Sequence, residues 1–152
     1  MKATLFVISI ANPILIGIYK NGILEETIEN DGKTSDILPH IVNQILEKQN
    51  IDEIIYVNGP GSYMSIKIAY IFLKTLSITL DIPFLAISGF SVNANSPIKA
   101  LGQKYFFLDS DGEIKTRFLD ENEKLNNFIL PQKIHYSLCF EDTLPNYQLP
   151  VV

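Results

Sequence analysis

Three apolar runs separated by turn residues open the chain. Residues 5–10 and 14–19 are rich in β-branched side chains, and Asn12-Pro13 separates them. Asn21-Gly22 follows the second run, and both residues accept the positive φ angles of a type I′ hairpin turn. The third run, 23–28, begins at once. The pattern predicts three consecutive strands joined by tight turns.

A helix is predicted after these strands. Apolar pairs recur every four residues between Ile37 and Leu46, which places one apolar stripe along a helix over 35–48. Thr34 or Ser35 is expected to cap its N-terminus, because the oxygen of either side chain can accept a hydrogen bond from a backbone N–H of the first turn. Proline 39 falls early in this helix, where a helix tolerates it.

The next segment repeats a strand and a helix. Residues 54–57 are continuously apolar, which is typical of a strand buried on both faces, and a long helix is predicted from residue 62 to about residue 80. Residues 83–87 supply another buried strand. Three strands, helix, strand, helix and strand predict an α/β fold with an open mixed sheet and packed helices. This order matches a ribonuclease-H-like or actin-like (ASKHA) half.

The composition changes after the last of these strands. Residues 88–99 are rich in Ser, Asn, Gly and Pro, so we divide the chain into an N-terminal lobe, 1–92, and a reduced C-terminal lobe, 93–152. The strands predicted in the second lobe are 104–108, 113–119 and 133–140. The first two flank a turn and form a β-hairpin, and the residues that follow the third are expected to be an irregular tail.

Charge and cysteine content narrow the function classes. The net charge is −5 and the 12 basic residues are scattered, so strong direct nucleic-acid binding is not expected. The single cysteine, Cys139, favours a reducing, cytoplasmic compartment, and His40 and His135 lie too far apart to predict a metal site. The apolar start of the chain is too short to span a bilayer, so no membrane association is predicted.

A glycine-rich turn between a strand and a helix is the most informative motif. Gly59, Gly61 and Ser62 are a candidate anion or nucleotide loop, because such a turn leaves backbone N–H groups unpaired at a helix N-terminus. The simpler interpretation is a tight turn whose helix is capped by Ser62. Pro60 removes one potential donor from the loop.

The helix that follows is apolar on more than one side. Lys67, Lys74 and Asp81 fall seven residues apart and form one narrow polar stripe, while most other positions are apolar. One apolar side must pack on the sheet. A second side has two equally weighted interpretations, which are packing against the helix over 35–48 and docking of a partner.

These residues resemble the TsaB (YeaZ) family, whose hallmark is Gly-Pro-Gly-Ser-Phe-Thr-Gly-Leu/Val-Arg-Ile-Gly at the start of a helix. The resemblance covers residues 1 to about 92. Within this range, Thr34-Ser35-Asp36 stands where the family has His-Ser-Glu. The residues that agree with the motif or replace a similar residue are Gly59, Pro60, Gly61, Ser62, Tyr63, Lys67 and Ile68, whereas Met64, Ser65 and Ala69 differ from it.

The resemblance implies an ASKHA fold and a role as the partner of TsaD in making threonylcarbamoyladenosine in tRNA. It also implies that the two helices of the first lobe bundle with TsaD or, in its absence, with a second copy, and that a TsaE-like ATPase assists. No cofactor would bind this chain tightly, although ATP or ADP could lie in the complex. The candidate partner-binding residues are Ile37, Ile41, Ile45, Ile66, Tyr70 and Leu73.

No catalytic or metal-binding residues are predicted. No carboxylate lies between Met1 and Glu25, whereas a phosphoryl-transferring ASKHA enzyme needs one near the end of its first strand to hold a divalent ion. A non-catalytic scaffold is therefore favoured, despite the label of glycoprotease relative that the family often carries. Two rivals stay open, namely a small nucleotide-binding phosphotransferase that uses the loop Gly59 to Ser62, and a self-contained homodimer.

Overall fold

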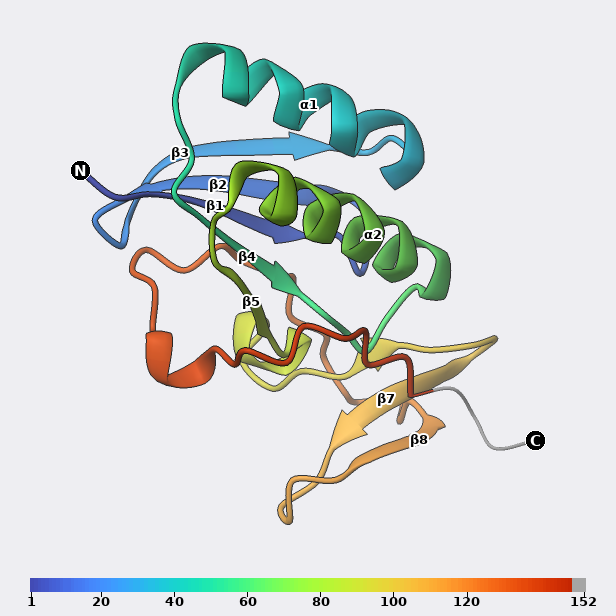
Figure 1. Cartoon of the computed structure of the whole chain (residues 1–152). Helices are drawn as coiled ribbons and strands as arrows, with labels where there is room; N and C mark the ends of the chain where they lie inside the picture. Colours follow the sequence, from blue (N-terminus) through green and yellow to red (C-terminus); the bar gives the residue numbers. More distant parts are fainter. Residues whose placement is uncertain (149–152) are drawn as a thin grey trace.

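The computed structural model describes residues 1–148, which fold around a five-stranded mixed sheet (Figure 1). The strand order is β3-β2-β1-β4-β5; the first three strands pair antiparallel, and β1, β4 and β5 run parallel. Its elements are β1 (Ala3–Ile8), β2 (Ile14–Lys20), β3 (Ile23–Asn30), α1 (Thr34–Lys48), β4 (Glu53–Val57), α2 (Tyr63–Leu80) and β5 (Phe84–Ile87). The predicted element order is confirmed.

Local sequence explains the strands of this sheet. Asn21 and Gly22 have φ angles of 51° and 82°, so they form the predicted positive-φ turn between β2 and β3. Every residue of β4 is buried, as expected for an apolar strand between two parallel neighbours. β3 lies at the edge of the sheet and carries Glu25, Glu26 and Glu29, whose charges discourage pairing with another chain at that edge.

Both helices cover one face of the sheet (Figure 1). Leu38 and Val42 of α1 and Ala69 and Leu73 of α2 are fully buried in one core cluster with the strands. The predicted cap of α1 is wrong, since Lys33 takes the N-cap position without a side-chain bond and Thr34 is already helical. The capping predicted for α2 is also absent.

Ser62 does occupy the N-cap position of α2. Its hydroxyl, however, pairs with the Ser65 hydroxyl at 3.3 Å and bonds no backbone N–H of the first turn. Both helix boundaries therefore follow from packing and backbone geometry, with no contribution from a side-chain cap.

The second half of the chain covers the opposite face of the sheet. Phe90, Ile98, Phe106, Leu130 and Ile134 pack in a second core cluster against β1 and β4. The elements there are the 3₁₀ helix η1 (Gly89–Val92), β6 (Ile98–Lys99), β7 (Lys104–Leu108), β8 (Ile114–Phe118) and the 3₁₀ helix η2 (Tyr136–Leu138). The predicted hairpin is confirmed as β7 and β8, and β6 extends it to three strands.

The C-terminal segment from residue 128 onward packs against the sheet. Its last described part, residues 141–148, is irregular as predicted. Tyr19 donates its phenolic O–H to the carbonyl of Pro131 at 2.6 Å, and Tyr56 donates to the carbonyl of Thr143. Tyr136 donates to the buried carboxylate of Glu53 at 2.6 Å. Residues 128–147 thus run back along the sheet, and residues 149–152, with Pro150, lie outside the described residues.

A strand over 133–140 was predicted there, and that prediction is wrong. Only two isolated bridges form, between Lys133 and Ile23 and between Phe140 and Ala86, and η2 lies between them. The apolar residues that suggested a strand instead serve as separate anchors of the tail. The division into two lobes at residue 92 stays a prediction.

Candidate docking face and glycine-rich loop

The buried side of α2 faces the sheet. Ile66, Ala69, Leu73 and Ser77 recur at three- and four-residue intervals, and all four are buried. Tyr70 lies beside this row, with its ring 6.3 Å from the rings of Tyr56 and Phe84. These contacts fix the orientation of the helix and therefore determine which residues point outward.

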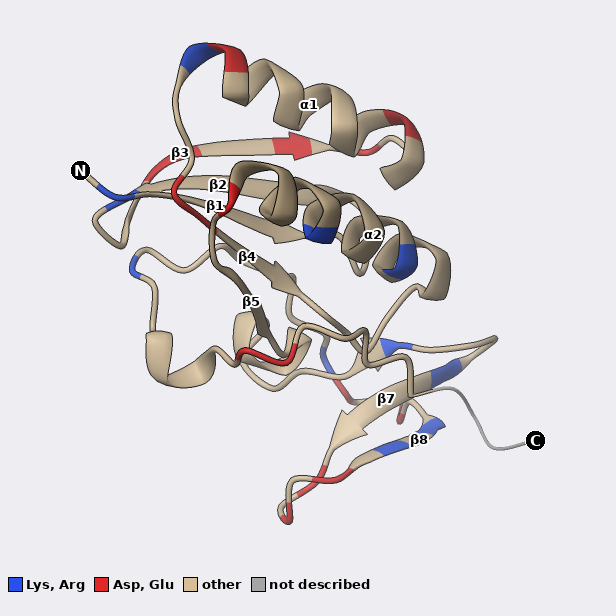
Figure 2. Ribbon diagram, in the orientation of Figure 1, with Lys and Arg blue, Asp and Glu red and all other residues tan. Residues whose placement is uncertain are grey.

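The outward side of α2 carries a row of apolar residues. Met64, Ile71 and Ile78 are 57%, 54% and 68% exposed, and their seven-residue spacing aligns them along the helix. We refer to these three residues as the α2 stripe. Lys67 and Lys74 are exposed beside it, and Figure 2 shows two separate basic positions on α2. An apolar row with a basic rim is typical of a protein interaction surface.

The apolar character of α2 also meets a simple membrane criterion. Among residues 1–148, it is the one helix long and apolar enough to cross a bilayer, judged by length and composition only. The helix of a folded domain can pass the same test. Ile66 and Leu73 are fully buried against the sheet, so α2 is part of the folded unit in this structure.

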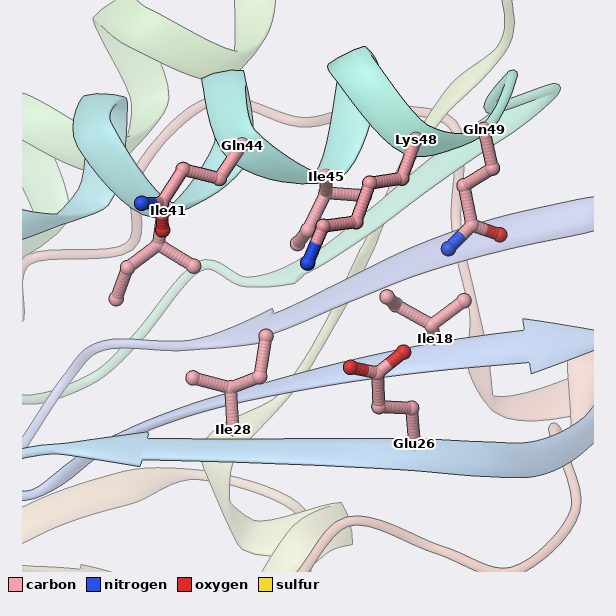
Figure 3. A pocket seen from close by; sticks show the side chains of 8 residues that line it. All are labelled: Ile18, Glu26, Ile28, Ile41, Gln44, Ile45, Lys48 and Gln49. Atoms are coloured by element: carbon pink, nitrogen blue, oxygen red, sulfur yellow. The ribbon is translucent and has the colours of Figure 1, made fainter.

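α1 has a different outward side. Its exposed residues are Ser35, Asp36, His40, Asn43, Gln44, Glu47 and Lys48, all of them polar. Ile41 and Ile45 point from α1 toward β2 and β3 and line a small hollow of about 100 Å³ with Glu26 and Lys48 (Figure 3). This hollow is a packing gap between a helix and the sheet edge, too small for a nucleotide.

Most of the predicted partner-binding residues lie in the core. Ile66 and Leu73 have no exposed surface, and Ile41 and Ile45 are 8% and 5% exposed. Ile37 and Tyr70 are half-buried. A partner could therefore reach only the last two without disrupting the fold. Sequence reasoning missed the α2 stripe, although its seven-residue repeat is the same signal that identified Lys67, Lys74 and Asp81 as a polar row.

The glycine-rich loop packs against two other segments. A Cβ at Gly59 would collide with the carbonyl oxygen of Asn146, and its φ of +127° is one that other residues rarely adopt. A Cβ at Gly61 would lie 2.7 Å from the Cβ of Ile10, and the N–H of Ser62 donates to the Ile10 carbonyl at 3.0 Å. The glycines thus admit the tail and the β1–β2 connection, which supports the tight-turn interpretation.

A cavity of about 590 Å³ lies beside this loop. Its lining is mostly apolar and includes Tyr63 and Tyr147, whose ring centroids lie 4.5 Å apart with the ring planes tilted by 38°. Lys99 is its one charged lining residue among residues 1–148, and the Lys99 Nζ donates to the carbonyl of Gly102 at 2.8 Å. The first-turn N–H groups of α2 could donate hydrogen bonds to an anion in this cavity. The nucleotide site proposed for the loop stays a prediction.

The acidic residues of the β7–β8 turn bond to their own backbone. Asp109 accepts hydrogen bonds from the N–H groups of Asp111 and Glu113 at 3.2 and 3.1 Å. Its carboxylate also lies 2.8 Å from the Nζ of Lys115, and bonds to Asp111 and Lys115 lower the pKa of Asp109 to about 2. Three carboxylates gather in this turn, but these bonds account for their arrangement as an Asx-type turn.

Cys139 and His135 do not form a nucleophile and base. They flank the 3₁₀ helix η2, and the Cys139 thiol donates to the backbone carbonyl of His135 at 3.9 Å and not to its imidazole. Burial raises the pKa of Cys139 above its ordinary value, which is the opposite of what an activated thiolate requires. This geometry provides no base for nucleophilic attack.

The sequence of this chain is similar to proteins whose names refer to the threonylcarbamoyl modification of adenosine in tRNA. Residues 32–105 match the family model TsaD, described as tRNA N6-adenosine threonylcarbamoyltransferase. The tRNA threonylcarbamoyladenosine biosynthesis protein TsaB of Buchnera aphidicola subsp. Acyrthosiphon pisum (strain APS) is 34% identical over 96 residues, covering 59% of this chain and 43% of that protein. The chain thus spans less than half the length of this relative.

Solved structures of YeaZ proteins share the architecture. YeaZ from Pseudomonas aeruginosa has a TM-score of 0.60 at 18% identity, covering 83% of this chain and 68% of that one. A protein with similarity to peptidase YEAZ from Pseudomonas aeruginosa has a TM-score of 0.60, also at 18% identity, covering 77% and 64%. The mixed sheet with its two helices is therefore the ASKHA-like α/β fold of the YeaZ structures.

The sequence comparisons add to this likeness in fold. The TsaD-like domain model covers the part of the chain that carries the loop and both helices, and the TsaB relative is 34% identical over 96 residues. Together with the YeaZ-like fold, these matches make the chain similar to TsaB (YeaZ) proteins in sequence and in architecture.

Proposed function

We propose that this chain acts in the threonylcarbamoyladenosine modification of tRNA as a non-catalytic subunit that binds a TsaD-like protein. The name of the TsaB relative supports the pathway, and the TsaD-like match over 32–105 includes α1 and α2. The observation that carries the proposal is the α2 stripe, because three exposed apolar side chains aligned on one helix form the centre of a helix-docking surface.

The proposed contribution of the chain is positional. The loop glycines serve close packing, the acidic turn bonds to its own backbone, and the thiol of Cys139 is not activated. Catalysis is accordingly assigned to the partner. A TsaE-like third protein and a homodimer in the absence of the partner stay predictions of the family resemblance.

The test compares exposed isoleucines inside the stripe with an exposed isoleucine outside it. Ile71→Gln combined with Ile78→Gln removes apolar surface from the stripe, and Ile129→Gln removes a 65% exposed isoleucine outside the helices. Each buried isoleucine contributes about 1.5–3 kcal/mol, so the stripe variant should weaken binding of the source organism's TsaD-like protein at least tenfold. Titration calorimetry measures this loss. Equal affinities for both variants would refute the proposed face.

A small nucleotide-binding phosphotransferase is the second candidate function. The cavity of about 590 Å³ beside Gly61 and Ser62 favours it, since its volume suits a nucleotide. If this candidate is correct, the isolated chain binds ATP with magnesium in the micromolar range and Gly61→Val abolishes that binding. Titration of the isolated chain with ATP and magnesium decides between the two functions.

A further inference from the structure

The charges on the rim of the α2 stripe are opposite in sign to the net charge of the molecule. Lys67 and Lys74 are the charged residues within Tyr63–Leu80, so the helix carries +2 in a chain whose net charge is −5. Both lysines are exposed, and no ion pair within residues 1–148 includes either of them. The two basic positions on α2 are separate from each other along the helix (Figure 2).

Three other basic residues of the chain are held in internal ion pairs. Lys115 lies 2.8 Å from Asp109, Arg117 lies 2.6 Å from Glu123, and Lys2 lies 2.9 Å from Glu53. Within the described part of the chain, the two lysines of α2 instead leave their charges without an ion-pair partner beside an apolar row. Charges in that position govern which partner a helix accepts, because they meet the flanks of whatever helix covers the row.

Self-pairing of α2 would bring these charges together. If two copies packed antiparallel about Ile71, position 67 of one copy would face position 75 of the other, adjacent to the second copy's Lys74. Like charges so placed repel each other, and the same arrangement would occur twice because a two-fold interface repeats every contact. A partner helix with carboxylates at that spacing would instead gain two attractive contacts.

We propose that Lys67 and Lys74 determine partner specificity, and that they select a helix with an apolar face flanked by two carboxylates about seven residues apart. This inference rests on the proposed function and identifies the kind of TsaD-like surface that docks on α2. The apolar row provides the contact area, and the two lysines discriminate an acidic helix from a second copy of this chain.

The experiment reverses charge without touching the apolar row. The variant Lys67→Glu with Lys74→Glu is compared with Lys104→Glu and Lys124→Glu, which changes the net charge equally on exposed residues outside the helices. The probe is the TsaD-like protein of the source organism, titrated at low and at high salt. The helix variant should bind about tenfold more weakly at low salt, and the control should bind like the unchanged chain.

Two further arms complete the design. Lys67→Arg with Lys74→Arg keeps both charges and should retain wild-type affinity, which separates a charge effect from a structural one. Lys67→Gln with Lys74→Gln, without the partner, should self-associate more strongly than the unchanged chain in sedimentation equilibrium. Urea unfolding shows that each variant is folded, since exposed lysines on a helix contribute little to stability.

Each contrary result is informative. If the complex forms and the helix variant matches the control, the specificity role is refuted while the docking function stands. If the unchanged chain binds no TsaD-like protein, the docking function and this inference fall together. Lysine-dependent binding to vesicles of anionic phospholipid, or a homodimer weakened by the charge reversal, would also overturn the inference, because it would show a different occupant of the same face.

Discussion

α1 and α2 lie on the same face of the same sheet, and their outward sides are opposite in character. Both bury an apolar row against the strands, represented by Leu38 in α1 and Leu73 in α2. Outward, α1 presents polar residues such as His40 and Asn43, whereas α2 presents the apolar α2 stripe. A helix needs one apolar side to fold onto a sheet, so folding does not account for the second apolar side of α2, which is the basis of the proposed docking face.

The largest expected effects concern the side that the two helices share. Leu38→Ala and Leu73→Ala each remove a side chain with no exposed surface, and each should lower the free energy of unfolding by about 2–5 kcal/mol. Ile71→Ala, on the outward side of α2, should change it by about 0.5 kcal/mol or less. Urea denaturation measures all three.

A charged residue in place of Leu73 would not serve as a test of docking. Such a substitution would unfold the chain and reveal nothing about docking, because the side chain is in the core. Should Ile71→Ala prove as damaging as Leu73→Ala, the outward side of α2 would have to be covered within the chain itself, and the contrast between the helices would disappear.

The next effect separates the outward sides. His40→Ala combined with Asn43→Ala alters exposed residues of α1, and Ile71→Gln combined with Ile78→Gln alters the α2 stripe. We expect the first pair to change affinity for the TsaD-like protein by less than about threefold, and the second to weaken it at least tenfold, since polar rim residues contribute little. Calorimetric titration gives both constants. A stronger loss from α1 would assign the docking centre to the other helix.

The sequence predicted the sheet and both helices because their apolar runs are long and their turns carry strong signals. Asn21-Gly22 leaves few alternatives to a hairpin, and the run ending at Val57 is too apolar to lie at the surface. The tail was less predictable. Ile134 and Phe140 anchor separate contacts, and a few apolar residues without a regular partner can indicate a strand that does not form.

The exposed residues of α2 could not be predicted for a geometric reason. Successive residues of a helix differ by about 100° around its axis, so Ile71 and Leu73 lie on nearly opposite sides. The sequence shows both as apolar and does not determine which side meets the sheet. Only the packing of Leu73 against the strands leaves Ile71 exposed, and the sequence predictions chose Leu73.

The smallest effect compares the N-termini of the two helices. Lys33 begins α1 without a side-chain cap, and its cation lies at the positive end of the helix dipole. Lys33→Asp supplies an acceptor for the first-turn N–H groups and should raise the free energy of unfolding by about 1 kcal/mol. Ser62→Ala at α2 should cost less than about 0.5 kcal/mol, because the Ser62 hydroxyl bonds Ser65 and no backbone N–H.

Thermal or urea unfolding of both variants measures these differences. A stabilised Lys33→Asp variant beside a neutral Ser62→Ala variant would confirm that neither helix depends on a side-chain cap in the native chain. A loss of about 1 kcal/mol from Ser62→Ala would instead mean that its hydroxyl caps α2 in solution. In that case the first-turn N–H groups of α2 would be less available to an anion, and the nucleotide-binding rival would lose its main donor set.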